Sequence, residues 1–318
     1  MQVQRLHLSS YYSEGFADLE QKMVQSLGLT YLYDQNLDKN TDIVLATSQV
    51  DWTGFSTDQL AKLKLIVHPN SGYDNYSFEQ FHQFRAPVIL GNSIRCHGVA
   101  EYSLSCLYQH FCAIPWSREW DPTRAFPKRK LLNELNILLF GFGHVGRIIH
   151  ESLSAHRCHI TVYDPYRFPD QKDKLAQIKS ETRNYDAIIM ACSLNEINQG
   201  LINSEVLSSL NERGCLINAA RGKLVSQTDL LEFLSANPQC FAYLDVTEQE
   251  PFNPADFETT PNIKLTSHIS GVSDSLDQKV LEFEEDVLRD FTTLLQEDFL
   301  KSFKDSLLQD RSQANYFI

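Results

Sequence analysis

The sequence predicts an α/β protein made of two doubly wound domains, and three observations support this prediction. Short apolar or β-branched runs alternate with helical patterns along the whole chain, which is typical of sheets built from βαβ crossovers. The length of 318 residues corresponds to two domains of roughly 150 residues each. Hydrophobic residues make up 42% and charged residues 22% of the chain, which excludes collagen, coiled coil and wholesale disorder.

The N-terminal part of the chain has the pattern of a small α/β unit. We expect its strands at 30–33, 43–47, 65–68 and 88–90. A helical stretch is predicted at 57–63, and a long, mostly apolar helix over 99–114. The polar segment 117–130, which holds two of the eleven prolines, is predicted to be an irregular excursion.

A second α/β run starts at Leu135. Its strands are expected at 135–140, 160–163, 187–191, 215–218, 241–244 and 263–266. Near-continuous apolar strands between polar helices indicate a parallel sheet covered on both faces. The last apolar pattern, from Leu276 to Leu294, predicts one long amphipathic helix. We expect this helix to return to the first unit, so that residues 1–96 plus 287–318 form one domain and residues 97–286 an inserted one.

The net charge and the cysteine content indicate which partners the protein is expected to bind and in which compartment it is expected to work. The net charge of −13 gives little long-range attraction for phosphate backbones or anionic lipid, so neither nucleic acid nor a membrane surface is expected to bind. No stretch has the length of a signal-peptide core or of a membrane span. The seven cysteines are scattered and never spaced C-x-x-C, which predicts free thiols in a reducing cytoplasm and no metal site.

A glycine-rich turn follows the strand predicted at 135–140. Gly141, Gly143 and Gly146 form a G-x-G-x-x-G pattern that runs into a helical stretch. In such a turn the first glycine bends the chain, the second lets the backbone approach a pyrophosphate, and the third packs helix on strand. Amides at the helix start then face the negative charge. The context therefore predicts a dinucleotide-binding site.

Asp164 stands at the end of the next strand, 23 residues after Gly141. A carboxylate there accepts hydrogen bonds from ribose hydroxyls and repels a 2′-phosphate, which favours NAD over NADP. An acidic turn residue beside Pro165 is the plainer interpretation, and Arg167 lies close enough to weaken the preference. We therefore predict NAD and leave NADP open.

Three charged residues follow three later strands. Arg221 follows the strand at 215–218, Glu250 the strand at 241–244, and His268 the strand at 263–266. In a doubly wound sheet the carboxyl ends of the strands line one crevice, where ligands bind. Each residue alone has an ordinary explanation, as a surface cation, a solvated loop acid or a structural histidine. Their joint placement predicts a site.

This set of side chains suits hydride chemistry on a carbonyl group. The carbonyl oxygen takes a proton as hydride reaches its carbon, and an imidazole titrates in the required range. A carboxylate beside the imidazole stabilises its protonated form and fixes its tautomer. A guanidinium can hold a substrate carboxylate through paired hydrogen bonds.

The ordered motifs GFGHVGR, VYDP, INAARGKLV, LDVTEQEP and LTSHISG resemble the D-isomer-specific 2-hydroxyacid dehydrogenase family. The resemblance extends from HPNSGYDN at 68–75 through GVAEYSL at 98–104 to the last long helix. It implies a Rossmann-like NAD-binding domain inserted into a flavodoxin-like substrate domain, with the active site in the cleft between them. It also implies a homodimer joined through the nucleotide domain.

The resemblance assigns roles to individual residues of this chain. Arg221 is expected to clamp the substrate, His268 to act as acid and base, and Glu250 to be its partner. The backbone amides of Ser71 and Gly72 are expected to hold the substrate carboxylate. Cofactor contacts are expected from Gly141, Gly143, His144, Val145, Gly146, Asp164, Ala219 and Asp245.

The sequence also departs from the family pattern. The usual Pro-Leu-Thr of the adenine pocket is Ser193-Leu194-Asn195 here, and Ser267 replaces the usual proline before the histidine. Two further groups have open interpretations. Arg95 and His97 are either specificity groups or surface residues. Trp116, Arg118 and Trp120 either cross to a partner subunit's site or pack in a dimer interface.

We therefore predict an NAD-dependent oxidoreductase that interconverts small 2-oxo acids and D-2-hydroxy acids. Formate oxidation is disfavoured because those family members carry Gln where Glu250 stands. A nucleotide-sensing protein like the corepressors of this fold is the alternative from another class, although the chain is barely longer than two domains need. Which acid is the substrate is open at this stage, from glyoxylate to bulkier 2-oxo acids and phosphorylated sugar acids.

Overall fold

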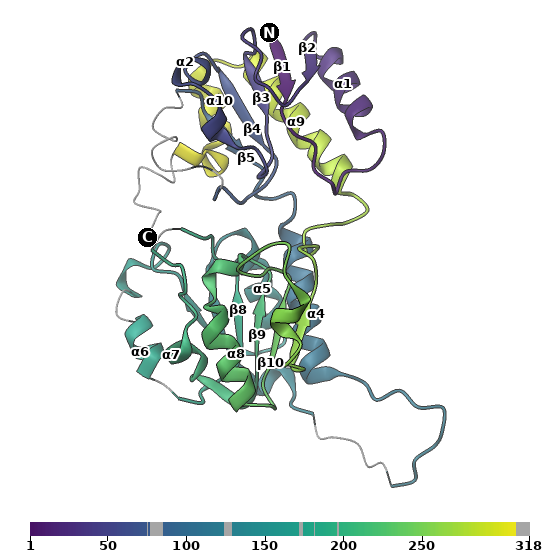
Figure 1. Ribbon diagram of the computed structural model, residues 1–318, viewed down its shortest axis with the longest axis vertical. Coiled ribbons are helices and arrows are strands. Elements are labelled where there is room, and N and C mark those ends of the chain that lie inside the picture. Colours follow the sequence, from purple (N-terminus) through teal and green to yellow (C-terminus); the bar gives the residue numbers. More distant parts are fainter. Residues whose placement is uncertain are drawn as a thin grey trace. The chain divides into compact units, whose positions relative to one another are not determined.

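The computed structural model describes residues 1–74, 76, 85–123, 129–171, 174–180, 182–195 and 197–309. The chain forms two compact units (Figure 1). Unit 1 contains Met1–Arg95 and the chain from Val272 onward, and unit 2 is Cys96–Gly271. The chain therefore leaves unit 1 once and returns to it once.

Unit 1 is built on a five-stranded sheet in the order β2-β1-β3-β4-β5. Its strands are β1 (Gln2–Arg5), β2 (Thr30–Tyr33), β3 (Ile43–Leu45), β4 (Leu65–His68) and β5 (Val88–Leu90). All pairings between them are parallel. Every residue of β3, β4 and β5 is buried, as expected for a parallel sheet covered on both faces.

The helices of unit 1 come from both ends of the chain. They are α1 (Phe16–Ser26), α2 (Thr57–Leu60), α9 (Leu276–Thr293) and α10 (Gln296–Ser302). Val287 and Leu288 of α9 lie in one hydrophobic cluster with Val3 and Ile43 of the sheet. Val280 and Leu276, about two and three turns before Val287 in the same helix, pack with Phe16 of α1. Because the whole of α9 packs within unit 1, the return lies at residues 271–272 and not at 286–287, a position inside the helix.

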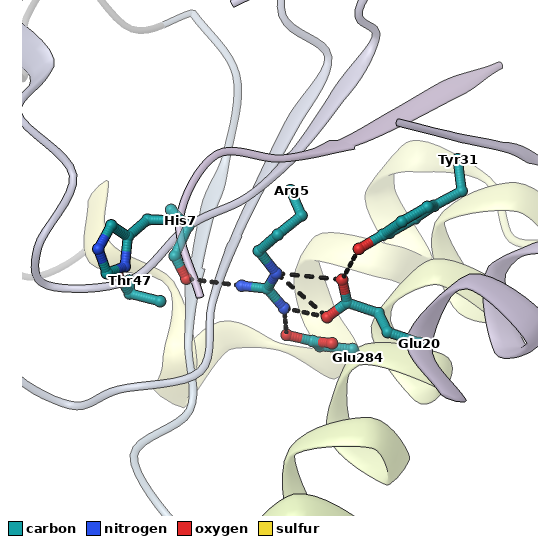
Figure 2. Close-up of polar contacts among 7 residues, drawn as sticks. Arg5, His7, Glu20, Tyr31, Thr47 and Glu284 are labelled. Atoms are coloured by element: carbon teal, nitrogen blue, oxygen red, sulfur yellow. Dashed lines mark hydrogen bonds and ion pairs between the residues drawn. The ribbon is translucent and has the colours of Figure 1, made fainter. Parts of the chain in front are cut away.

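A buried arginine joins the two chain segments of unit 1. Arg5 at the end of β1 is fully buried, and its guanidinium donates hydrogen bonds to Glu20 of α1 and to Glu284 of α9, the latter at 2.6 Å (Figure 2). The Tyr31 hydroxyl donates to the Glu20 carboxylate at 2.6 Å. Burial and the neighbouring Glu20 carboxylate raise the pKa of Glu284. Arg5 lowers the pKa of Glu20, so Arg5 stabilises the charged form of Glu20, while the protonated form of Glu284 is favoured.

Unit 2 is built on a six-stranded sheet in the order β11-β10-β9-β8-β6-β7. The strands are β6 (Asn136–Phe140), β7 (His159–Tyr163), β8 (Tyr185–Met190), β9 (Leu210–Asn218), β10 (Phe241–Leu244) and β11 (Ile263–Leu265). All pairings are parallel. The strand order reverses direction at β6, which lies between β7 and β8. The turn after β6 is therefore at a topological switch point.

Helices cover both faces of this sheet. They are α4 (Cys96–Cys112), α5 (His144–Ala155), α6 (Lys174–Ser180), α7 (Ser204–Leu207) and α8 (Gln227–Ala236). Leu107 of α4 and Ile149 of α5 pack in one cluster, on the Ile137 and Leu139 side of β6. Helices α6, α7 and α8 contribute to the other cluster, with Leu138 and Phe140. The predicted class, two doubly wound α/β domains, is confirmed.

Short 3-10 turns complete the described structure, at Trp52–Gly54, Leu132–Glu134, Pro169–Gln171, Gly222–Leu224, Pro254–Phe257 and Lys304–Ser306. Among the described residues, no helix is long and apolar enough to cross a membrane.

Candidate active site

The glycine-rich turn closes tightly on one side and is open on the other. Gly141 has φ +97°, and a Cβ there would lie 2.6 Å from the Ala191 carbonyl oxygen. A Cβ on Gly146 would lie 2.1 Å from the carbonyl oxygen of Gly141. A Cβ on Gly143, in contrast, would meet nothing within 4 Å. Two glycines are therefore needed to fold the turn, and the third leaves open space beside the backbone.

Helix α5 begins directly at this turn. Its N-cap residue is Gly143, and no side chain caps the helix start. The positive end of the helix dipole and the open space at Gly143 therefore coincide, an arrangement that suits a phosphate group. His144 and Val145, also predicted to contact the cofactor, are the first two residues of the helix.

Asp164 follows β7 and is tied to the glycine-rich turn. Its Oδ2 accepts a hydrogen bond from the Phe142 amide at 2.7 Å. Its Oδ1 accepts from the amides of Tyr166 at 3.1 Å and Arg167 at 2.9 Å. These three bonds fix the orientation of the carboxylate.

His268 and Glu250 form a direct pair at the carboxyl ends of β11 and β10. Nδ1 of His268 lies 2.8 Å from Oε2 of Glu250. The two side chains are 42% and 40% exposed, so both reach solvent. The other carboxylate oxygen of Glu250, Oε1, accepts the Thr247 amide at 3.3 Å. Oε1 of Glu250 is therefore held by the Thr247 amide, and Oε2 orients the imidazole of His268.

The backbone at His268 is held in an unusual conformation by Asp245. His268 has φ +57°, in the left-handed region that a residue with a Cβ seldom adopts. The Asp245 carboxylate accepts the amides of Ile269 and Ser270, both at 2.8 Å. The His268 amide donates to the Asp245 carbonyl, also at 2.8 Å. Three consecutive amides of this loop thus bond to one buried residue, which stabilises the conformation.

Arg221 follows β9 in a loop that packs against the Glu250 segment. The Asn218 side-chain amide donates to the Arg221 carbonyl at 2.9 Å, and Nη1 of Arg221 donates to the Ala220 carbonyl at 2.8 Å. The neighbouring Gly222 is so close to this segment that a Cβ would lie 1.8 Å from the Thr247 carbonyl oxygen. The predicted residues Arg221, Glu250 and His268 therefore come from adjacent loops of unit 2.

Two residues that support this site were not predicted. Tyr102 of α4 hydrogen-bonds Thr266 through their hydroxyls at 2.7 Å, and the Thr266 hydroxyl donates to Asp245 Oδ1 at 2.6 Å. Burial raises the pKa of Tyr102 to about 12, so its hydroxyl stays protonated at neutral pH. Tyr102 lies within the motif at 98–104, but nothing in the sequence pairs it with a residue 164 positions later.

Residues 193–195, which replace the usual Pro-Leu-Thr of the family, lie in a turn held by two asparagine side chains. Oδ1 of Asn195 accepts the Asn198 amide at 2.9 Å, and Oδ1 of Asn198 accepts the Asn195 amide at 2.8 Å. This reciprocal pair builds the turn without the usual proline. The preceding Cys192 is a neutral thiol, because burial and then the Asp164 charge raise its pKa to about 12.

The remaining predicted residues lie in several places. Ser71 and Gly72 belong to unit 1, in the loop after β4, where Ser71 is exposed and Gly72 half-buried. Asn75 of the same motif lies outside the described residues. Arg95 ends the first segment of unit 1, and burial lowers its pKa. His97 is exposed in the first turn of α4.

Comparisons with known proteins agree with this geometry. Residues 113–270 match the family model described as D-isomer specific 2-hydroxyacid dehydrogenase, NAD binding domain. The chain belongs to the D-isomer-specific 2-hydroxyacid dehydrogenase family. Unit 2 is therefore its NAD-binding domain, and the protein is an NAD(P)-dependent 2-hydroxyacid oxidoreductase.

The chain is similar to enzymes that are named for different substrates. A glyoxylate reductase of Thermococcus kodakarensis is 24% identical over 248 residues, which cover 73% of this chain and 73% of that protein. A D-lactate dehydrogenase from Aquifex aeolicus, solved with NAD and lactic acid, has a TM-score of 0.72 at 18% identity and covers 97% of this chain and 99% of its own.

A second similar structure carries the other nicotinamide cofactor. It is an NADPH-dependent glyoxylate/hydroxypyruvate reductase from Sinorhizobium meliloti, in complex with NADP and malonate. Its TM-score is 0.70 at 19% identity, and it covers 92% of this chain and 93% of its own. The likeness confirms the predicted two-domain Rossmann-like fold of the dehydrogenase.

Proposed function

We propose that this dehydrogenase reduces small 2-oxo acids to D-2-hydroxy acids, reversibly, with His268 as the proton donor and acceptor. The observation that carries the proposal is the 2.8 Å contact between Nδ1 of His268 and Glu250. Because Glu250 takes the Nδ1 side, the Nε2 side of the ring is the one available to a substrate.

The side chains divide the chemistry among them. The nicotinamide cofactor, when bound, supplies or accepts the hydride. In the reducing direction, protonated His268 gives the proton on Nε2 to the substrate carbonyl oxygen. Glu250 accepts the hydrogen bond of Nδ1 and thereby orients the ring with Nε2 towards the substrate. Arg221 pairs with the substrate carboxylate and polarises the adjacent carbonyl group, while the amides of Ser71 and Gly72 bind the same carboxylate.

The residues of unit 2 fit a dinucleotide. The open space at Gly143, beside an uncapped helix start, suits a pyrophosphate. We assign Gly141, Gly146, His144 and Val145 to the same contact region. We assign Ala219 to the cofactor site and Asp245 to the nicotinamide end. The Asp245 carboxylate also fixes the His268 loop by accepting two of its backbone amides.

We also propose that NAD is preferred to NADP. The Asp164 carboxylate is fixed by three backbone amides, so it is held where a 2′-phosphate would meet a negative charge. Arg167 donates its amide to Asp164, and its guanidinium lies over the ring of Tyr166, 5.9 Å from the centroid. A comparison of Kd for NADH and NADPH tests the preference.

The experiment that tests the function is NADH oxidation across a panel of 2-oxo acids, repeated with NADPH. The panel runs from glyoxylate and pyruvate through hydroxypyruvate to bulkier and phosphorylated acids. Turnover with at least one of them is expected, together with D-configured product. Tight NADH binding without turnover on any 2-oxo acid would instead support a nucleotide sensor. Formate should be a poor substrate, since Glu250 stands where the formate-oxidising members carry Gln.

For assembly, we propose a homodimer joined through unit 2. The described segment after α4, residues 113–123, extends away from the body of unit 2 (Figure 1). Trp116 and Trp120 on it are 87% and 80% exposed, which is unusual for indole rings in a protein that has no partner. Trp116, Arg118 and Trp120 are then interface residues. Sedimentation of the wild type and of Trp116→Ser/Trp120→Ser distinguishes dimer from monomer.

We also propose a reducing compartment such as the cytoplasm. All seven cysteines are free thiols, and proteins of oxidising compartments commonly use disulfides.

A further inference from the structure

A buried histidine lies directly before the loop that carries Ser71 and Gly72. His68 is the last residue of β4 and is fully buried. Its Nε2 lies 2.9 Å from the carbonyl oxygen of Gly72, and its Nδ1 lies 3.1 Å from the hydroxyl of Tyr76. The imidazole thus connects the end of the strand to the loop four residues later.

The two contacts engage both ring nitrogens of His68. A carbonyl oxygen can only accept a hydrogen bond, so Nε2 carries a proton and donates to Gly72. Nδ1 faces the Tyr76 hydroxyl, which keeps its proton because burial raises its pKa and so has a proton to donate to Nδ1. With both nitrogens engaged, His68 offers neither of them to a substrate.

The core of unit 1 holds this arrangement in place. The Tyr76 ring stacks on the buried Trp52 ring with centroids 5.3 Å apart and planes at 26°. The edge-on contact of His68 with Tyr76 has a centroid distance of 5.5 Å. A rigid group of three rings therefore fixes the position of the Gly72 carbonyl.

Fixing that carbonyl fixes the loop. The bond between His68 and Gly72 closes residues 68–72 into a ring, which restricts the backbone around Ser71 and Gly72. In a trans peptide the carbonyl and the amide of the same peptide group point in opposite directions, so the bond to the Gly72 carbonyl directly orients the Tyr73 amide. The Ser71 and Gly72 amides lie inside the ring that this bond closes, so their backbone is restricted through that ring. Amides held in this way need no further ordering when an anion binds.

We propose that His68 is a positioning residue that holds the Ser71 and Gly72 amides in the geometry required by the substrate carboxylate. The inference rests on the proposed function, which gives those two amides to the carboxylate. It adds that carboxylate affinity depends on a buried histidine that donates from Nε2 to the loop. The carboxylate is present in both ground state and transition state, so the effect belongs in KM more than in kcat.

The test uses graded variants in the full-length protein with NADH bound. His68→Leu removes both hydrogen bonds, Tyr76→Phe removes only the donor to Nδ1, and His68→Gln keeps an N–H donor at a similar distance from the backbone. KM and kcat are measured with the best 2-oxo acid. Kd is measured for NADH and for oxamate, an unreactive 2-oxo acid analogue.

His68→Leu is expected to raise KM and the oxamate Kd by about tenfold, with kcat changed less than about threefold and NADH affinity unchanged. Tyr76→Phe should raise KM by roughly twofold to fivefold. His68→Gln should recover most of the wild-type KM, an effect that a purely structural role does not predict.

Unit 2 supplies a matched control. Nε2 of His110 lies 2.9 Å from the Arg213 carbonyl oxygen, and Nδ1 lies 3.3 Å from the Tyr243 hydroxyl. This histidine has the same kinds of partner but no proposed role in carboxylate binding. His110→Gln and His110→Leu should leave KM and the oxamate Kd at wild-type values.

Specific outcomes would overturn the inference. If both His68 variants and Tyr76→Phe keep KM and the oxamate Kd within about twofold of the wild type, His68 does not position the loop. If His68→Leu does not fold, Tyr76→Phe decides by the same twofold criterion, because His68→Gln is expected to keep values near those of the wild type. Wild-type protein without turnover on any 2-oxo acid contradicts the proposed function, whereas turnover insensitive to these variants contradicts only the role of His68.

Discussion

The Asp245 carboxylate holds the loop that contains His268: its two oxygens accept the backbone amides of Ile269 and Ser270, both at 2.8 Å. The loop that bears the imidazole is therefore bonded to the end of β10. The Nδ1 of the ring contacts Glu250, which also follows β10. One strand end thus controls both the backbone and the ring orientation of His268.

Removing the imidazole should abolish most of the reaction while the cofactor still binds. His268→Ala is expected to lower kcat by several orders of magnitude, because no other described group in this loop supplies the proton. Arg221→Ala should have an effect of similar size through loss of carboxylate binding and carbonyl polarisation. Kd for NADH is measured alongside by fluorescence titration. Near-normal turnover in either variant on the best substrate would show that the roles are wrongly assigned.

Glu250 and Glu248 provide a matched pair in the same segment. Glu250→Gln removes the charge beside Nδ1 and is expected to lower kcat by about tenfold to a hundredfold, since the protonated ring loses its stabilising partner. Glu248→Gln makes the same change two residues away, and kcat should stay within about twofold because no contact joins Glu248 to His268 among the described residues. Equal losses in the two variants would contradict the pairing.

Asp245→Asn tests the anchoring of the loop. An amide offers one acceptor oxygen in place of two, so at least one backbone N–H of the loop loses its partner. The unfolding free energy of unit 2 should fall by about 1–3 kcal/mol, and kcat should fall because His268 leaves its strained conformation. Thermal unfolding and steady-state kinetics measure the two effects. A stable variant with wild-type kcat would show that the loop keeps its shape without this residue.

The glycines of the turn should separate stability from cofactor binding. Gly143→Ala places its Cβ in open space, so thermal stability should be unchanged while the Kd for NADH rises by about tenfold or more. Gly146→Ala would bring its Cβ to 2.1 Å from the Gly141 carbonyl oxygen, so both stability and NADH affinity should fall. If Gly143→Ala binds NADH normally, the pyrophosphate does not approach that position.

Glu284 should make the stability of unit 1 depend on pH. Its pKa in the folded protein is raised by burial and by Glu20. The folded state therefore holds a proton that the unfolded state releases above the ordinary glutamate pKa, and wild-type stability should fall as pH rises through that value towards the raised one. Glu284→Gln imitates the protonated side chain. Its unfolding free energy should exceed that of the wild type at pH 8 by on the order of 1 kcal/mol, and the difference should vanish near pH 4.

Urea denaturation at several pH values measures this effect. Glu282→Gln is the control on the same helix, because Glu282 is exposed and its replacement should leave the pH profile unchanged. A wild-type profile that is flat between pH 4 and 8 would contradict a protonated Glu284.

Much of unit 2 could be predicted from the sequence because its strands are apolar on both faces and bounded by recognisable turns. Strand β10 has the predicted bounds, Phe241–Leu244. Strand β1 was missed because Gln2–Arg5 reads as polar. Gln4 is buried there by hydrogen bonds to the carbonyls of Asp34 and Asn36 at 2.9 and 2.8 Å. Such partners exist only in the folded chain, so local hydrophobicity cannot reveal the strand.

The candidate site shows the same division. Gly141, Arg221, Glu250 and His268 could be predicted as candidates because each follows an apolar strand, and parallel strands bring their carboxyl ends to one edge. The supporting contacts were not identifiable. The bond of Thr266 to Asp245 and that of His68 to Gly72 depend on side-chain geometry at positions where many residue types are compatible with the local pattern.

The bond between Arg5 and Glu284 spans 279 positions of the chain, and this separation has a consequence for biosynthesis. A ribosome makes β1 before unit 2 and α9 after it. All of unit 2 has been synthesised before Glu284 exists, so the NAD-binding domain can complete its core co-translationally. Unit 1 cannot complete its core at that stage, because Arg5 still lacks its hydrogen bond to Glu284. The domain begun first is therefore the one finished last, and its exposed intermediate is where chaperone dependence of this dehydrogenase should concentrate.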